Sequence, residues 1–246
     1  MTPPRAVVFD LGGTLVHWPD WEEAAPTKWS FAYDALGLAG GDRVWPAREV
    51  FIEAMRGAEK AHWERVDREH WSGPPTGLVS DGFRRLGVEV SEPELLATLD
   101  GYARAVEGWS TAFPDSRDTL VALRERGYRL GLLSNTWWAA EWHNADIAAH
   151  GLADLLDELV YTSDLSHSKP HPSVFAEIAR RLDVAPTACV MIGDRQVDDV
   201  SGAKAVGMRA IWRRNDYGFP SSTIAPDAIV DRVSELPALL RGWGGA

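Results

Sequence analysis

An aspartate directly follows the first apolar run of the chain. Residues 6–9 read Ala-Val-Val-Phe, and Asp10 opens the segment Asp-Leu-Gly-Gly-Thr. A carboxylate held beside a bound cation can attack phosphorus and form an aspartyl-phosphate. Gly12 and Gly13 allow the backbone to turn tightly and to approach a ligand closely. Asp10 is therefore a candidate nucleophile, although an aspartate at the end of a strand can also be purely structural.

Two later loops carry groups that can bind an anion. Ser134 and Asn135 follow the apolar segment 129–133, and Lys169 lies in the sequence His-Ser-Lys-Pro-His. A short hydroxyl with adjacent backbone N–H groups can hold phosphate oxygens. A lysine can offset the charge of both a carboxylate and a phosphate. The alternative interpretations are a helix cap for Ser134 and a solvated turn residue for Lys169.

A third loop is acidic. Gly193 and Asp194 follow the apolar segment 189–192, and Asp198 and Asp199 come shortly after. Mg²⁺ prefers oxygen ligands and binds through one or two protein carboxylates together with a substrate phosphate. We expect Asp194 to bind the ion directly, and Asp199 to hold a metal-bound water or to orient Lys169. The alternative is that the Asp198-Asp199 pair only stabilises the positive end of a helix.

These loops require strands that end at a common edge. Apolar segments closed by polar or glycine residues predict five further strands, at 129–133, 158–162, 189–192, 208–212 and 228–230. Helical patterns separate them at 116–126, 140–150, 172–183 and 199–206. Strands that alternate with helices predict an α/β fold with a doubly wound parallel sheet. Such sheets bind ligands beyond the carboxyl ends of their strands, where Asp10, Ser134 and Asp194 are expected.

The segment between the first two motifs has a different character. Helical patterns cover roughly 21–37, 45–70, 76–87 and 92–108, and no strong strand signal interrupts them. We therefore expect a catalytic core formed by 1–17 and 112–246 and an inserted helical domain at 18–111. The insert holds 10 basic and 17 acidic residues, and its tryptophans, like Trp137 and Trp138 of the core, either wall the pocket or pack inside the protein.

Composition excludes several classes of protein. The net charge is −11, and nucleic-acid binding normally needs a basic face, so a nucleic-acid partner is not expected. No apolar run approaches the roughly 18 residues of a membrane helix, and no membrane partner is expected. Cys189 is the single cysteine and cannot form an intramolecular disulfide. Residues 1–5 lack the features of a signal peptide, which predicts a cytoplasmic protein; no oligomeric state is indicated.

The ordered set of motifs resembles the haloacid dehalogenase (HAD) superfamily, in its phosphatase-like form. The resemblance rests on strand-Asp-x-Gly-Gly-Thr, strand-Ser-Asn, Lys-Pro and strand-Gly-Asp-x₄-Asp, and it spans about residues 5–213. It implies a Rossmann-like core with a helical cap domain inserted after the first motif. It also implies Asp10 and Lys169 as catalytic residues. Phosphate would be bound by Ser134, Asn135, Lys169, Gly12 and Gly13, and Mg²⁺ by Asp10, the Gly12 carbonyl, Asp194 and Asp199.

One position departs from the pattern of the phosphatases that the sequence resembles. These enzymes usually carry a second aspartate two residues after the nucleophile, as general acid and base, where this chain has Gly12. General acid–base catalysis is worth about 10²–10⁴ in rate. We therefore expect a Mg²⁺-dependent hydrolase of a small phosphorylated metabolite that favours good leaving groups, with His17 as a candidate substitute. Two alternatives remain, a carbon–halogen hydrolase and a non-catalytic protein that binds a phosphorylated ligand.

Overall fold

Six parallel strands form the main sheet of the computed structural model, which describes residues 2–244. Their order across the sheet is β5-β4-β1-β6-β7-β8, with β1 at the centre. The strands are β1 (Ala6–Phe9), β4 (Arg129–Ser134), β5 (Glu158–Tyr161), β6 (Cys189–Gly193), β7 (Arg209–Arg213) and β8 (Ala228–Val230). The predicted doubly wound α/β fold is therefore confirmed.

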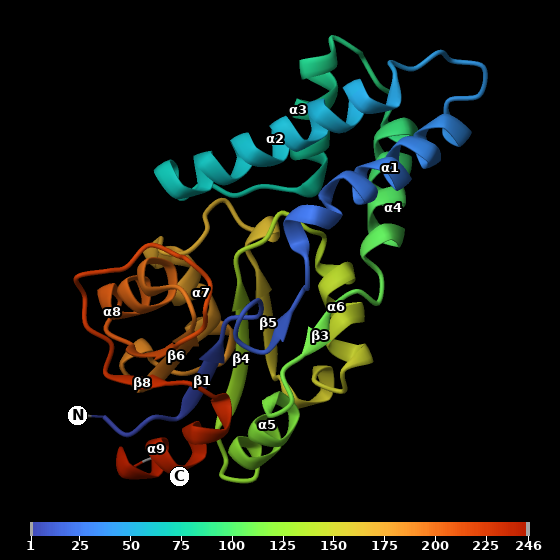
Figure 1. The fold of residues 1–246 in the computed structure, drawn as a ribbon. Coiled ribbons are helices and arrows are strands. Elements are labelled where there is room, and N and C mark those ends of the chain that lie inside the picture. Colours follow the sequence, from blue (N-terminus) through green and yellow to red (C-terminus); the bar gives the residue numbers. More distant parts are fainter. Residues whose placement is uncertain (1, 245–246) are drawn as a thin grey trace.

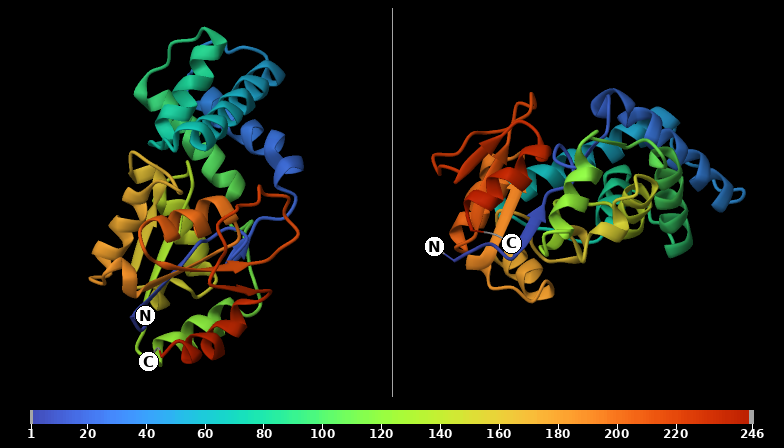
Figure 2. Two further views of the ribbon diagram at one scale, coloured as in Figure 1. Left: turned by 90° about the vertical axis from the view of Figure 1, so that its left-hand side faces the viewer. Right: turned by 90° about the horizontal axis from the view of Figure 1, so that it is seen from below.

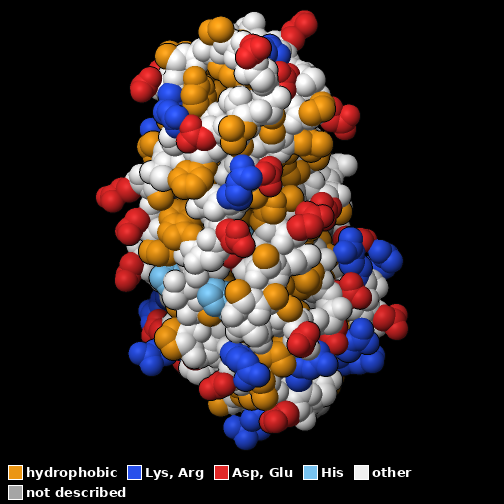
Figure 3. All heavy atoms as spheres, turned by 90° about the vertical axis from the view of Figure 1, so that its right-hand side faces the viewer, with side chains coloured by type: hydrophobic (Ala, Val, Ile, Leu, Met, Phe, Trp, Pro, Cys, Tyr) orange, Lys and Arg blue, Asp and Glu red, His pale blue; other side chains and the backbone are white. Residues whose placement is uncertain are grey.

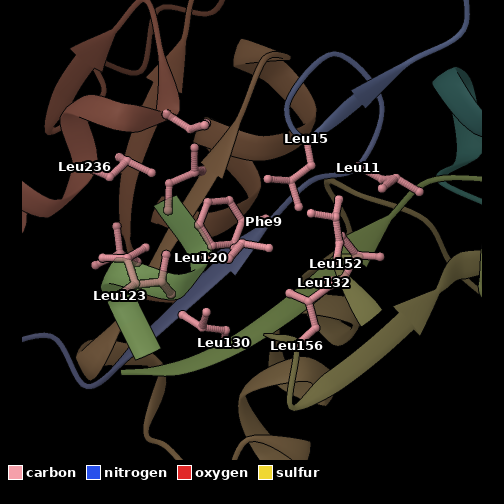
Figure 4. Packing of buried hydrophobic residues seen from close by; sticks show 14 of the residues in the cluster. Phe9, Leu11, Leu15, Leu120, Leu123, Leu130, Leu132, Leu152, Leu156 and Leu236 are labelled. Atoms are coloured by element: carbon pink, nitrogen blue, oxygen red, sulfur yellow. The ribbon is translucent and has the colours of Figure 1, made fainter. Parts of the chain in front are cut away.

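Helices cover both faces of the sheet. One face carries α5 (Ser116–Arg124), α6 (Ala140–Ala149) and α9 (Leu236–Gly242), and the other carries α7 (Pro172–Arg181) and α8 (Gly202–Ala205). Side chains of a strand alternate between the two faces. Val7 and Phe9 accordingly pack into the first cluster, drawn in Figure 4, whereas Ala6 and Val8 pack into the second. The central strand is thus buried on both sides, as its unbroken apolar sequence requires.

Four helices form a separate layer beyond the carboxyl ends of the strands (Figure 1). They are α1 (Trp21–Ala39), α2 (Arg48–Glu69), α3 (Pro75–Leu86) and α4 (Glu92–Val106), and residues 21–106 are called the helical lobe below. Ser91 precedes α4, and its N–H donates to the Glu94 carboxylate over 2.8 Å, a capping interaction that fixes this helix start. The lobe has its own apolar cluster around Trp29, Phe51 and Tyr102. Figure 2 shows the lobe lying at the opposite end of the sheet from α5 and α9.

A short antiparallel ribbon carries the chain between the sheet and the helical lobe. Its strands are β2 (Val16–His17) and β3 (Thr111–Ala112), and Val16 pairs with Ala112. Neither strand of the ribbon was expected from the sequence, because a two-residue strand leaves no periodic pattern. The expected boundaries at 17/18 and 111/112 both fall at this ribbon. Met1, Gly245 and Ala246, which belong to the expected core, lie outside the described residues.

Two elements of the core differ from the expected ones. The helix expected at 199–206 begins earlier, as a π-helical turn at Gln196–Ser201 that continues into α8. Helix α9 was not expected, since its seven residues are too few to display a clear period. Short 3₁₀ turns complete the fold at Ala153–Leu155, Thr162–Asp164, Pro186–Ala188 and Val233–Glu235.

Exposed apolar side chains lie on both the helical lobe and the core. Figure 3 shows those of the lobe gathered on the upper half of one face, with acidic groups between them. Exposed members include Phe31, Leu38, Val50 and Leu96. No helix in residues 2–244 is long and apolar enough to cross a membrane.

Candidate active site

Asp10 and Lys169 meet at the centre of the sheet edge. Asp10 directly follows β1, and its N–H donates to the Ile192 carbonyl of β6 over 2.9 Å. The Lys169 ammonium donates to Asp10 Oδ1 at 2.6 Å, to Asp199 Oδ1 at 2.7 Å and to the Leu133 carbonyl at 3.0 Å. All three charged side chains are buried. The structure therefore brings together two residues that are 159 positions apart and were expected to share one site.

Asp194 lies beside this pair. Carboxylate oxygens of Asp10, Asp194 and Asp199 lie within 4.8 Å of one another. Asp194 Oδ2 accepts a hydrogen bond from the Asn215 side chain at 2.6 Å. Asp194 Oδ1 is buried and has no hydrogen-bond partner among the described residues. A buried carboxylate oxygen without a partner carries an unfavourable free energy of desolvation. A cation or a hydrogen-bond donor bound at this oxygen would offset that free energy.

The charges of this cluster do not balance. Three carboxylates face one ammonium, and burial raises the pKa of Asp10 to about 7, although Lys169 acts to lower it. Burial and the nearby Asp199 carboxylate raise the pKa of Asp194 to about 6. Burial acts to lower the pKa of Lys169, but Asp10 and Asp199 outweigh it and the pKa lies above its usual value. A divalent cation among these oxygens would restore the balance and favour the ionised carboxylates.

The donor set fits Mg²⁺, which takes oxygen ligands and keeps some of its waters. Asp194 offers a free oxygen, and Asp10 contributes a second carboxylate beside it. Asp199 is differently engaged, because Oδ1 accepts from Lys169 and Oδ2 accepts from the Arg195 N–H at 2.9 Å. These contacts favour the expectation that Asp199 orients Lys169 over the expectation that it binds the ion directly.

A wide turn positions Asp199. The chain leaves β6 through Gly193 and enters the π-helical turn at Gln196–Ser201, in which the Asp199 N–H donates to the Arg195 carbonyl. A Cβ on Gly193 would lie 2.1 Å from Asp199 Cγ, so no side chain fits there. π-Helical turns recur at functional sites, and this one folds Asp199 back toward Lys169.

The side chain of Asn135, a residue expected to bind phosphate, is engaged by Lys169. Its Oδ1 accepts from the Lys169 N–H at 2.8 Å, and its Nδ2 donates to the Lys169 carbonyl at 3.0 Å. The side chain thus clamps the backbone of Lys169, which precedes a cis peptide bond to Pro170. Only the Asn135 main chain remains for phosphate.

The helical lobe also touches the Lys169 loop. The loop after α2 pairs with the segment before Lys169, through an antiparallel bridge between Trp71 and His167. The Ser168 N–H donates to the His70 carbonyl at 2.9 Å, and the Ser72 N–H donates to the Ser166 carbonyl at 3.1 Å. The lobe is thereby attached to the core on the side opposite the β2–β3 ribbon. No local sequence signal marks this contact.

The glycines of the first loop have distinct neighbours. Gly13 has φ +76°, and a Cβ there would lie 2.3 Å from Asp194 Oδ2. A Cβ on Gly12 would lie 3.2 Å from Cζ3 of Trp18, so the indole ring occupies the space beside this position. His17 lies on β2 and stacks on Phe113, with ring centroids 5.1 Å apart. An aromatic ring thus lies beside Gly12, where the sequence resemblance leads us to expect an acid–base aspartate.

One cleft between the sheet edge and the helical lobe is lined by most of these side chains. Its volume is about 1180 Å³, and its floor includes Asp10, Ser134, Lys169 and Asp194. Gly12, Gly13 and Asn135 border it as well, together with His17, Trp18, Trp137 and Trp138. Every residue expected in the site therefore lines the cleft except Asp199, which lies buried beneath it.

Two contributors were not expected. Asn215 follows β7 by two residues and supports Asp194, and Arg195 stands within the third motif and supplies the N–H that holds Asp199. Both follow strands of the same sheet edge, so their place after a predicted strand was an available signal. Cys189, by contrast, is buried within β6, as expected.

Comparisons with known proteins agree with this geometry. The model of the haloacid dehalogenase-like hydrolase family matches residues 4–207. The glyceraldehyde 3-phosphate phosphatase of Methanopyrus kandleri is 31% identical over 96% of this chain and 97% of its own. The phosphoglycolate phosphatase of Shigella sonnei is 29% identical over 96% of this chain and 92% of its own.

A solved structure extends the likeness. The 2-haloacid dehalogenase from Pseudomonas syringae pv. Tomato is 28% identical, with a TM-score of 0.68, over 98% of this chain and 99% of that one. The fold is thus shared by relatives of two chemistries. The family match covers all four motifs, and the chain belongs to the haloacid dehalogenase-like hydrolases.

Proposed function

We propose that this protein is a Mg²⁺-dependent phosphatase that hydrolyses small phosphomonoesters through an aspartyl-phosphate on Asp10. The observation that carries the proposal is the partnerless, buried Oδ1 of Asp194 beside Asp10 and Lys169. A carbon–halogen hydrolase of this family has no need for a metal, whereas a site with excess buried carboxylate is suited to one. The two phosphatase relatives support the same choice.

The reaction follows from the positions of the side chains. The Asp10 carboxylate attacks phosphorus in line with the ester oxygen, the new O–P bond forms, and the old P–O bond breaks, so that the leaving group departs as an alkoxide or phenolate and takes a proton from water. Lys169 offsets the charge that develops on the phosphoryl oxygens, with Ser134 as a further donor. Water then cleaves the aspartyl-phosphate and regenerates Asp10. Bound Mg²⁺, held by Asp10, Asp194 and the Gly12 carbonyl, would neutralise part of the phosphate charge.

The helical lobe would act as a cap in this reaction. It lies over the cleft and is joined to the core by the β2–β3 ribbon and by the contact between His70–Ser72 and Ser166–Ser168. Such a layer excludes bulk water and selects the substrate. We propose 18–111 as the cap domain, with 1–17 and 112–246 as the catalytic core. The cytoplasmic location expected from the sequence stays a prediction.

The decisive experiment is hydrolysis of p-nitrophenyl phosphate with Mg²⁺ and with EDTA, for the wild type and Asp10→Asn. Its leaving group needs little protonation, so the glycine at position 12 matters least with this substrate. We expect Mg²⁺-dependent phosphate release that vanishes in the variant. Asp183→Asn is a matched control, because Asp183 is exposed and its positive φ tolerates asparagine.

Other outcomes lead to the alternatives. Release of halide from a 2-haloacid in the presence of EDTA would identify a carbon–halogen hydrolase. Binding of a phosphate analogue without turnover of any ester would identify a non-catalytic binding protein. Either result would reject the phosphatase proposal.

A further inference from the structure

The wall of the cleft that faces the phosphate site is aromatic. Trp18 and Trp63 reach it from the lobe and its linker, and Trp137 and Trp138 reach it from the loop after β4. Trp18 and Trp138 lie edge to face, with ring centroids 5.7 Å apart. Trp137 and Trp138 are buried, so the partly exposed indoles of Trp18 and Trp63 are the rings on which a planar group can stack. The cavity is also far larger than a two- or three-carbon ester requires.

The charged groups on the same side of the cleft are acidic. Asp20, Glu23 and Asp67 line it and are exposed at its rim. Among the lobe side chains that the structure describes, none that lines the cleft is a lysine or an arginine. A second negative charge on a substrate would therefore meet carboxylates there without a counter-ion.

Cationic side chains near the cleft do not neutralise the negative charge of this acidic rim. On α2, Lys60 pairs with Glu64 at 3.8 Å, and Arg65 and Arg68 pair with Glu69 at 2.9 and 2.7 Å. None of these three cations lines the cleft.

The cations that do line the cleft belong to the core. Lys169 is committed to Asp10 and Asp199. Arg195 pairs with Asp198 at 3.3 Å and covers the ring of Phe219. The two cations of the cleft thus lie at the proposed phosphate site, where each is paired with carboxylates. The charged side chains on the lobe side of the cleft remain acidic.

We propose that this cleft selects phosphomonoesters whose organic group is aromatic and carries no negative charge. The inference rests on the proposed phosphatase function and concerns the substrate of that same site. A ring stacks on the indole wall, whereas a carboxylate, as in phosphoglycolate, meets the acidic rim. The selectivity therefore differs from that of the relatives whose names specify two- or three-carbon phosphates.

The test compares two esters that both release a primary alcohol, so that leaving-group chemistry is closely matched. We expect kcat/KM for 2-phenylethyl phosphate to exceed that for 2-carboxyethyl phosphate at least tenfold. Trp63→Ala should shrink this ratio severalfold, whereas Trp243→Ala, directly after α9 and outside the cleft, should leave it unchanged. Asp67→Lys should shrink the ratio by raising kcat/KM for the carboxylate ester, and Glu64→Lys, one turn away and outside the cleft, should not.

The outcomes separate the two proposals. Equal or greater kcat/KM for the carboxylate ester, with hydrolysis that depends on Asp10, would overturn the selectivity and leave the phosphatase function standing. A tenfold preference that Trp63→Ala and Asp67→Lys both leave intact would also overturn it, since the wall would not be its cause. Hydrolysis of neither ester, nor of p-nitrophenyl phosphate, above the Asp10→Asn background would reject both proposals.

Discussion

The two ends of the cleft are built in opposite ways. At the phosphate end, the segments after β1, β5 and β6 supply charged groups that bind one another, Asn215 after β7 donates to Asp194, and the free acceptor is Asp194 Oδ1. On the lobe side, Trp18 and Trp63 line the wall together with the buried Trp138, and carboxylates lie at the rim. In our proposals the first arrangement binds a phosphoryl group and a cation, whereas the second discriminates between organic groups. Chemistry and selectivity would then belong to different parts of the cleft.

The two parts are nevertheless packed together. Trp137 and Trp138 follow the Ser134 loop directly, yet they belong to the apolar cluster of the helical lobe. Trp137 stacks on Trp29 of α1, with centroids 5.9 Å apart and planes 7° apart, and contacts Tyr102 of α4 at 4.9 Å. Both indoles thus serve in the core and as wall. The lobe is therefore fixed to the same loop that carries Ser134, the proposed phosphate ligand.

The largest effect should come from breaking the charge network at the phosphate end. Lys169→Met removes the cation that two buried carboxylates share, so we expect kcat to fall by about 10³-fold or more. Steady-state phosphate release measures the loss. Lys204→Met is the control, because Lys204 pairs only with Asp227 of the surface. Activity of Lys169→Met within tenfold of the wild type would show that Lys169 is not part of the machinery.

The rate of hydrolysis should depend on the basicity of the ester's leaving group. Without a general acid beside Gly12, rates should fall steeply as the leaving group becomes more basic. Between nitrophenyl and alkyl esters we expect a drop of about 10²-fold, within the usual range for one acid–base group. A series of substituted phenyl phosphates gives the slope, and a flat line would contradict this expectation.

His17 provides the control for that experiment. If His17 served as the acid, His17→Ala would steepen the dependence on the leaving group. We expect no change, because the ring stacks on Phe113. Gly12→Asp would not restore a general acid without other changes, because its Cβ would lie 3.2 Å from Trp18 Cζ3 and the indole ring would have to move.

The contrast between the two ends also explains what the sequence could predict. Asp10, Ser134 and Asp194 stand in short motifs next to strand ends, and parallel strands bring such loops to one edge, whereas Lys169 was found from its Lys-Pro motif between β5 and α7. The aromatic wall has no comparable signal, because which face of Trp63 or Trp18 is turned to the cleft depends on how the lobe packs. The ribbon β2–β3 and the Trp71–His167 bridge were missed for the same reason, since each rests on pairing between distant segments.

Positioning of Lys169 should be separable from its charge. Asn135→Ala removes both hydrogen bonds that hold the Lys169 backbone, so we expect kcat to fall about tenfold while KM changes less than about twofold. Asn144→Ala is the control, because its side chain also accepts a hydrogen bond, from Tyr161, but lies outside the cleft. A rise in KM with unchanged kcat would instead indicate that the Asn135 amide binds the substrate.

The smallest effect concerns the stability of the aromatic wall. His143 is buried against Trp138, and its Nε2 lies 2.8 Å from Thr136 Oγ1. Burial lowers the pKa of His143 to about 3. Between pH 6.5 and 3 the unfolded chain therefore binds a proton that the folded protein excludes, so stability is lost as pH falls through this window.

We expect wild-type protein to lose about 1–2 kcal/mol of unfolding free energy from this group between pH 7 and pH 5. Urea unfolding at both pH values measures the loss, which His143→Gln should remove while the glutamine retains a polar contact to Thr136. His62, whose pKa is lowered to about 4 by burial, adds a loss of the same sign that remains in the variant. His17→Gln, at a half-buried position, serves as the matched control. An identical pH dependence in the wild type and His143→Gln would mean that the folded protein tolerates a charged imidazole beside Trp138. The difference in polarity between the two ends of the cleft would then be smaller than the geometry indicates.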